Sequence, residues 1–198
     1  MLEEENAGGQ GHTGLLLQDS EGDWWYYYWG PIPGNDNVSI ENIWKLSTSG
    51  DKNFGFARNL GKCEGKDMRD IEAIKEVLCA YVESEYPKTK VNSDEEKQLF
   101  VMYNSYQLLS KAIYFEGDYS ASCSVAQKKT ELRYHLLASN CLQRSNGIMM
   151  VSDWRFGLIG RVNPLAAIIP NLAAPYVSLI PTKKEEYPWI LVNLAKSR

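Results

Sequence analysis

The stretch Tyr134-His-Leu-Leu-Ala-Ser-Asn-Cys-Leu-Gln-Arg-Ser145 has the pattern of a short apolar strand that leads into a helix. Ser139 and Asn140 are good helix N-caps, and the helix is expected to continue over residues 142–150. Cys141 would then lie in the first helical turn, where free N–H groups and the positive end of the helix dipole lower the pKa of a thiol. The alternative is a buried structural cysteine, because free cysteine is among the most buried residue types.

A second informative stretch lies near the start of the chain. The segment Gly11-His-Thr-Gly-Leu-Leu-Leu-Gln-Asp-Ser-Glu-Gly-Asp-Trp-Trp-Tyr-Tyr-Tyr-Trp-Gly30 contains an apolar run, a turn-rich piece and an aromatic run. This pattern predicts a β-hairpin whose first strand begins at His12.

The register of this hairpin decides which side chain lies beside the histidine. Side chains alternate across a strand, so pairing Gln18 with Trp24 would place Tyr28 on the same face as His12. A register shifted by one residue would place Trp29 there instead.

A histidine strand followed by a cysteine helix resembles the order found in the circularly permuted papain-like hydrolases. That group includes the lecithin:retinol acyltransferase-like enzymes and permuted relatives of the NlpC-type peptidases. The resemblance covers residues 11–30 and 134–150 and leaves the middle and the last third of the chain unmatched. It implies an α+β fold, with a small antiparallel sheet packed against helices. It also implies acyl transfer through a thioester, with Cys141 as the nucleophile and His12 as the base.

The third catalytic group is left open by the sequence. Permuted relatives usually carry a polar residue, often histidine, on the strand that follows the histidine strand, and this chain has an aromatic run there. Tyr28 is the residue whose hydroxyl the expected register places beside His12, so it is the candidate to orient the imidazole.

His135 competes with His12 as the base. It precedes Cys141 by six positions on the predicted strand, so reaching the thiol would require a sharp reversal of the chain.

The resemblance also suggests substrates and partners. Similar proteins cleave amide bonds in peptides or peptidoglycan, or transfer acyl chains from lipids. Permuted versions also occur as toxin domains of secreted bacterial proteins, for which a cognate inhibitor (immunity) protein is expected. The second hypothesis is a non-enzymatic binding domain that uses the aromatic strand Trp24–Trp29 as a surface.

Composition narrows the possible functions. The chain has 198 residues and a net charge of −4, which predicts one domain over residues 11–198 after a flexible lead of residues 1–10. The acidic balance makes nucleic acid an unexpected partner. The acidic start does not resemble a signal peptide, and no apolar run reaches the roughly 20 residues of a membrane-spanning helix. We therefore expect a soluble protein that is cytoplasmic as made, with export by a non-classical apparatus left open.

The four cysteines are irregularly spaced and predict neither a zinc site nor a disulfide framework, and no cofactor is expected. Cys63 and Cys79 are interpreted as ordinary residues. Cys123, near the predicted start of a short helix, is the main rival thiol.

Pattern and capping signals predict the remaining elements. Irregular structure is expected over residues 31–66 and a helix over 67–86 capped by Asp67. Further predictions are a helix from Ser93 that turns its large apolar residues inward, a strand and turn over 111–118, a short helix ending near residue 131, and a helix near 164–169.

Overall fold

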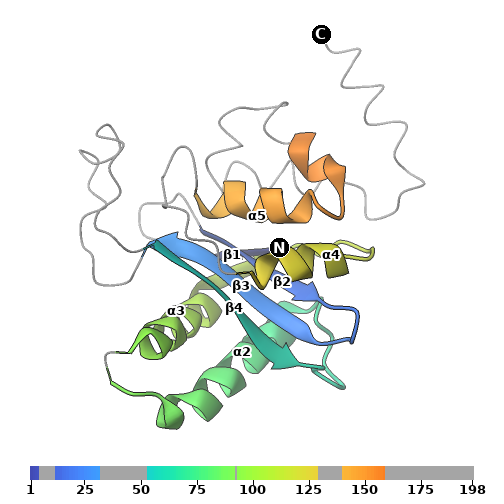
Figure 1. The fold of residues 1–198 in the computed structure, drawn as a ribbon. Helices are drawn as coiled ribbons and strands as arrows, with labels where there is room; N and C mark the ends of the chain where they lie inside the picture. The colour runs from blue at the N-terminus through green and yellow to red at the C-terminus, as the bar shows by residue number, and fades with distance from the viewer. Residues whose placement is uncertain (5–11, 32–52, 92, 129–139, 159–198) are drawn as a thin grey trace, which may run out of the picture.

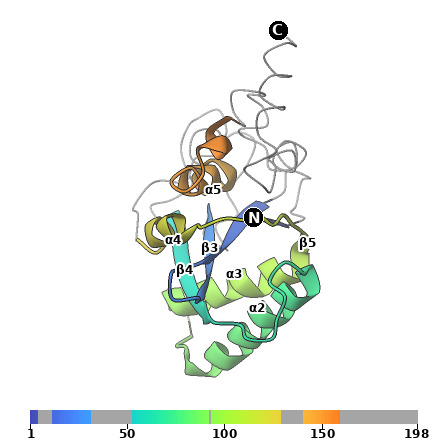
Figure 2. The ribbon, with the colours of Figure 1, turned by 90° about the vertical axis from the view of Figure 1, so that its right-hand side faces the viewer.

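A computed structural model describes residues 1–4, 12–31, 53–91, 93–128 and 140–158. Within these ranges the chain forms a five-stranded antiparallel sheet with the order β4-β3-β2-β1-β5. Helices α4 and α5 lie on one side of the sheet, and α2 and α3 lie on the other (Figures 1 and 2). The predicted α+β class is confirmed. No helix in these ranges is both long and apolar enough to cross a membrane.

The predicted hairpin is present, with the expected register. The five strands are β1 (Leu2–Glu4), β2 (His12–Gln18), β3 (Trp24–Pro31), β4 (Asn53–Gly61) and β5 (Leu109–Ala112). Gln18 pairs with Trp24 across the turn between β2 and β3. Asp19 stabilises that turn, because its carboxylate accepts hydrogen bonds from the Asp23 backbone N–H at 2.9 Å and from the Trp25 indole at 2.8 Å.

Strand β1 corrects the prediction for the start of the chain. It lies between β2 and β5, and Leu2, which is 2% exposed, pairs with Gly14 and Ala112. The expectation of a flexible lead is therefore wrong for β1, while residues 5–11 lie outside the described part of the chain. Three residues carry too little pattern to predict a strand, and this one is held by neighbours on both sides.

Strand β4 corrects the prediction of irregular structure over residues 31–66, of which 32–52 are not described. Gly55 in this strand pairs with Trp29, and a Cβ at that position would collide with the Trp29 indole ring. A glycine inside a strand can therefore mark a close approach of a neighbouring side chain, although in the sequence it looks like a loop signal.

The helical bounds agree with the predictions in part. The helices are α2 (Ile71–Glu85), α3 (Asp94–Leu108), α4 (Ser120–Ala126) and α5 (Cys141–Met149), with 3₁₀ turns η1 (Tyr86–Lys88) and η2 (Trp154–Leu158). Ser93 caps α3 as predicted by accepting from the Glu96 backbone N–H at 3.1 Å. The cap of α2 is Asp70 rather than Asp67, whose carboxylate binds Arg69 instead. Helix α4 ends at Ala126, before the predicted position.

Two apolar layers hold the helices against the sheet. On the α2 and α3 side, Tyr26 donates a buried hydrogen bond to the Ser105 hydroxyl of α3 at 2.8 Å. Tyr103 of α3, which was expected to face inward, is 42% exposed, so that part of the prediction is wrong. On the other side, the buried residues that join the sheet to α4 and α5 include Leu15, Leu17, Tyr27, Trp29, Cys123, Leu142, Ile148 and Met149.

Candidate active site at the start of helix α5

Helix α5 begins at the cysteine, as the sequence predicts. Asn140 and Gln143 form a reciprocal capping box: the Gln143 backbone N–H donates to the Asn140 side chain at 2.9 Å, and the Asn140 N–H donates to the Gln143 side chain at 3.1 Å. This cap places Cys141 in the first turn, at the positive end of the helix dipole. Cys141 is 3% exposed. The strand predicted before Asn140, which includes His135, lies outside the described residues.

Helix α5 packs against β2 and β3. Leu142, Ile148 and Met149 of the helix share an apolar cluster with Leu15 of β2 and Trp29 of β3. The helix that begins at the candidate nucleophile is therefore in direct contact with the strand that begins at the candidate base.

The imidazole of His12 lies on the other face of that strand. Its ring stacks on Tyr28, with 4.4 Å between ring centroids and an interplanar angle of 28°. Tyr28 belongs to the apolar cluster of α2 and α3, whereas Leu15 and Leu17 point toward α5. The structure thus brings His12 and Tyr28 together, as the hairpin register predicts, and does not bring the His12 ring to Cys141. By alternation, Thr13 is the residue at the start of β2 that faces α5.

Burial sets the protonation of this histidine. His12 is 4% exposed, and desolvation lowers its pKa from 6.5 to about 3. Its Nε2 atom is buried and has no hydrogen-bond partner among the described residues. The imidazole is therefore neutral at neutral pH, and in this buried position it is a weak base. Tyr28 contacts it through the ring face, so the expected orientation by a hydroxyl is replaced by stacking.

The rival thiol, Cys123, is unsuited to nucleophilic attack. Burial, followed by the Asp19 carboxylate, raises the pKa of this thiol to about 11. Its sulfur accepts a hydrogen bond from the Gln127 side chain at 3.4 Å. Cys63 and Cys79 are partly exposed, and burial together with Asp23 raises the pKa of Cys63. Cys123 is thus a structural core residue.

The aromatic strand does not form an open platform. Its residues Tyr26, Tyr27, Tyr28 and Trp29 are all buried between the two helical layers. Trp25 is partly exposed, but its indole N–H is bound to Asp19. This arrangement removes most of the surface on which the hypothesis of a non-enzymatic binding domain depends.

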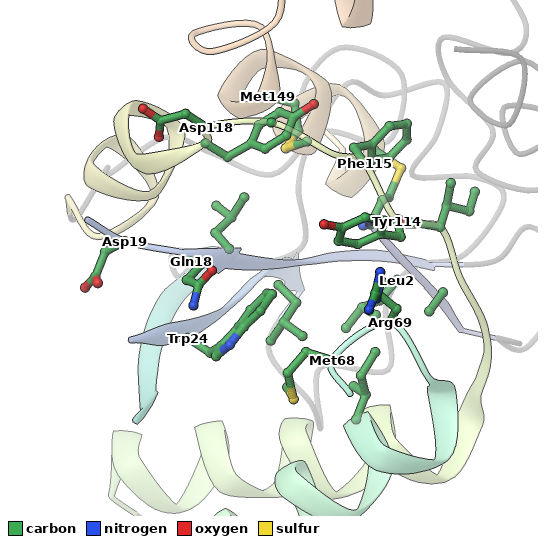
Figure 3. Close-up of a pocket in the computed structure, with 18 residues that line it drawn as sticks. Leu2, Gln18, Asp19, Trp24, Met68, Arg69, Tyr114, Phe115, Asp118 and Met149 are labelled. Atoms are coloured by element: carbon green, nitrogen blue, oxygen red, sulfur yellow. Dashed lines mark hydrogen bonds between the residues drawn. The ribbon is translucent and has the colours of Figure 1, made fainter. Parts of the chain in front are cut away.

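A pocket of about 160 Å³ lies at the far end of α5 (Figure 3). The charged residues that line it already have partners: Arg69 pairs with Asp67, Asp118 accepts from the Ser120 hydroxyl at 2.6 Å, and Asp19 accepts from Trp25. Met149 lines this pocket, and the helical rise puts Cys141 about 12 Å away along the axis. The pocket is therefore separate from the thiol. No local sequence pattern marks this pocket, because its lining comes from many elements.

The arginine one turn after the cysteine was also missed. The Arg144 guanidinium carbon lies 5.3 Å from the centroid of the Trp29 ring. The signal was available, since residues at positions i and i+3 of a helix lie on neighbouring parts of its surface.

The described residues contain no group of three His, Cys, Asp or Glu side chains that could hold a metal ion. No family model, curated protein or solved structure matches the chain.

Proposed function

We propose that this chain is a cysteine-dependent hydrolase or acyltransferase of the permuted papain-like type, acting on an amide of a peptide or peptidoglycan, or on a lipid ester. The observation that supports the proposal is the packing of the helix that begins at Cys141 against the strand that begins at His12. Resemblance alone supports a role as a secreted toxin effector with a cognate inhibitor protein.

The proposed chemistry uses Cys141 as the nucleophile. Its sulfur attacks the substrate carbonyl while the thiol proton passes to a neutral imidazole, and the backbone N–H at the start of α5 donates to the developing oxyanion. The imidazolium then returns the proton to the leaving group, and a thioester remains on Cys141. Water or an acceptor alcohol or amine attacks this thioester, which restores the thiol.

His12 is the proposed base, and this assignment adds a conformational requirement. In the structure its neutral ring is held against Tyr28, on the face of the sheet opposite α5. Because His12 is the first residue of β2 and pairs with Glu4 of β1, turning its side chain toward α5 breaks the stack on Tyr28 and this end of the pairing between β1 and β2. The proposal requires this turn when substrate binds, with the stack on Tyr28 holding the ring in the resting state.

Comparing variants of the two histidines tests the assignment of the base. We expect His12→Gln to slow acetylation of Cys141 by p-nitrophenyl acetate about 100-fold, because general-base assistance is lost, and His135→Gln to leave the rate nearly unchanged. Intact mass spectrometry follows the acetyl-enzyme, and circular dichroism checks the fold. The opposite ranking would assign the base to His135, and unchanged rates in both variants would rule out a histidine base.

A further inference from the structure

Arg144 carries a charge that the described residues do not neutralise. Its guanidinium is partly buried and stacks over Trp29, and its Nε atom is buried without a hydrogen-bond partner in that part of the chain. No salt bridge joins it to a carboxylate of the described residues. Arg69 provides a contrast: it lies 5.4 Å from the Tyr114 ring centroid in a similar stack, but it is ion-paired with Asp67.

A buried hydroxyl lies beside this guanidinium. Tyr27 is 3% exposed, and its hydroxyl has no hydrogen-bond partner among the described residues. Burial raises the pKa of Tyr27, while the Arg144 guanidinium lies close enough to oppose that rise. The phenol therefore stays protonated at neutral pH and can donate a hydrogen bond.

The chemistry of these groups specifies what is missing. Nearly all buried polar groups in folded proteins have hydrogen-bond partners. Here the buried Arg144 Nε–H can only donate, the Tyr27 hydroxyl can also donate, and the guanidinium carries a positive charge. A water molecule could accept these hydrogen bonds but could not neutralise the charge. An anion can do both.

We propose that Arg144, together with the Tyr27 hydroxyl, binds a carboxylate of the substrate. This inference rests on the proposed function, because it places the carboxylate relative to Cys141. Side chains at i and i+3 of a helix lie on neighbouring parts of its surface, so the bound carboxylate lies on the same side of α5 as Cys141. The substrate is then an amide with an acidic residue or a free carboxyl terminus near its scissile bond, rather than a neutral lipid ester.

Stacking on Trp29 makes the site specific for a planar anion. The aromatic face fixes the guanidinium plane and leaves its edge for two parallel hydrogen bonds to a carboxylate. Because Arg144 is partly exposed while Tyr27 and Cys141 are buried, it is the member of the group that a ligand meets first.

Titration with glutarate, and with its uncharged analogue glutaramide, tests the carboxylate site directly. NMR signals of the Arg144 Nε–H and the Trp29 indole N–H report on binding. We expect glutarate to shift both signals and glutaramide to shift neither. Arg144→Gln should weaken glutarate binding about tenfold or more, and Tyr27→Phe should weaken it less, since charged hydrogen bonds are the stronger ones. The matched control Arg69→Gln removes an equally stacked arginine and should change nothing.

Several outcomes would overturn the inference: no glutarate binding, equal binding of glutaramide, or unchanged affinity in Arg144→Gln. If that variant does not fold, Arg144→Lys keeps the charge but lacks the Nε–H and the planar stack, and it must still weaken binding. Comparing glutarate binding with the reactivity of Cys141 separates the two proposals. Glutarate binding to a protein whose Cys141 proves unreactive would contradict the proposed function alone, and a reactive Cys141 in a protein that does not bind glutarate would contradict the carboxylate site alone.

Discussion

Cys141→Ala is expected to lower the turnover of an amide substrate at least about 1,000-fold, because without the sulfur no thioester can form. The assay follows release of the amine from peptides that carry an acidic residue beside the scissile bond. Cys123→Ala is the matched control, because Cys123 is also buried but its raised pKa keeps the thiol protonated at neutral pH. It should lose stability to a similar extent and retain full turnover.

The double variant Cys141→Ala/His12→Gln tests whether the two residues act as one unit. Residues that share one proton transfer and one attack have strongly non-additive effects, so the double variant should be no slower than Cys141→Ala alone. A further large loss in the double variant would show that His12 contributes through a separate route.

The second large effect concerns stability in acid. The folded pKa of His12, about 3, lies below its value of 6.5 in the unfolded chain, so the unfolded state binds more protons between these two values. The stabilisation from keeping His12 neutral is therefore complete above pH 6.5 and is lost as the pH falls toward 3. Each pH unit in that window costs about 1.4 kcal/mol, so the loss between pH 6.5 and pH 5 is about 2 kcal/mol.

Urea unfolding of wild type and of His12→Phe at both pH values measures this loss. Phenylalanine cannot titrate and preserves a ring that stacks on Tyr28, so the variant should lack the 2 kcal/mol of acid destabilisation attributable to His12. Equal pH dependence of the two proteins would contradict the burial of a neutral imidazole. An NMR titration of His12 with a midpoint above 6.5 would instead indicate a ring already paired with the thiolate.

Local signals predicted the elements of the site well. The aromatic run and the turn fixed the hairpin and its register, and the capping residues at Asn140 placed Cys141 in the first helical turn. These features depend on residues close together in the sequence. Strands β1 and β4 were missed because each is held by pairing with distant segments and carries glycine or too few residues to show a pattern.

The orientation of His12 could not be predicted in the same way. Alternation gives two sets of residues on β2, one with His12 and the other with Thr13, but it does not say which set faces α5. That choice depends on how the whole sheet packs between its two helical layers. A shift of the strand register by one residue exchanges the two faces. The sequence therefore predicted the neighbour Tyr28 and could not predict the separation of the His12 ring from Cys141.

The rate of alkylation at each cysteine tests most directly whether Cys141 is an activated nucleophile. Exposure and nucleophilicity predict different orders of alkylation of the cysteines. Cys63 and Cys79 are partly exposed, while Cys123 and the proposed nucleophile Cys141 are buried. With limiting iodoacetamide at neutral pH and peptide mass spectrometry, we predict that Cys141 is modified first and Cys123, its buried control, last. An order that follows exposure, with Cys63 and Cys79 modified before Cys141, would contradict the proposed function.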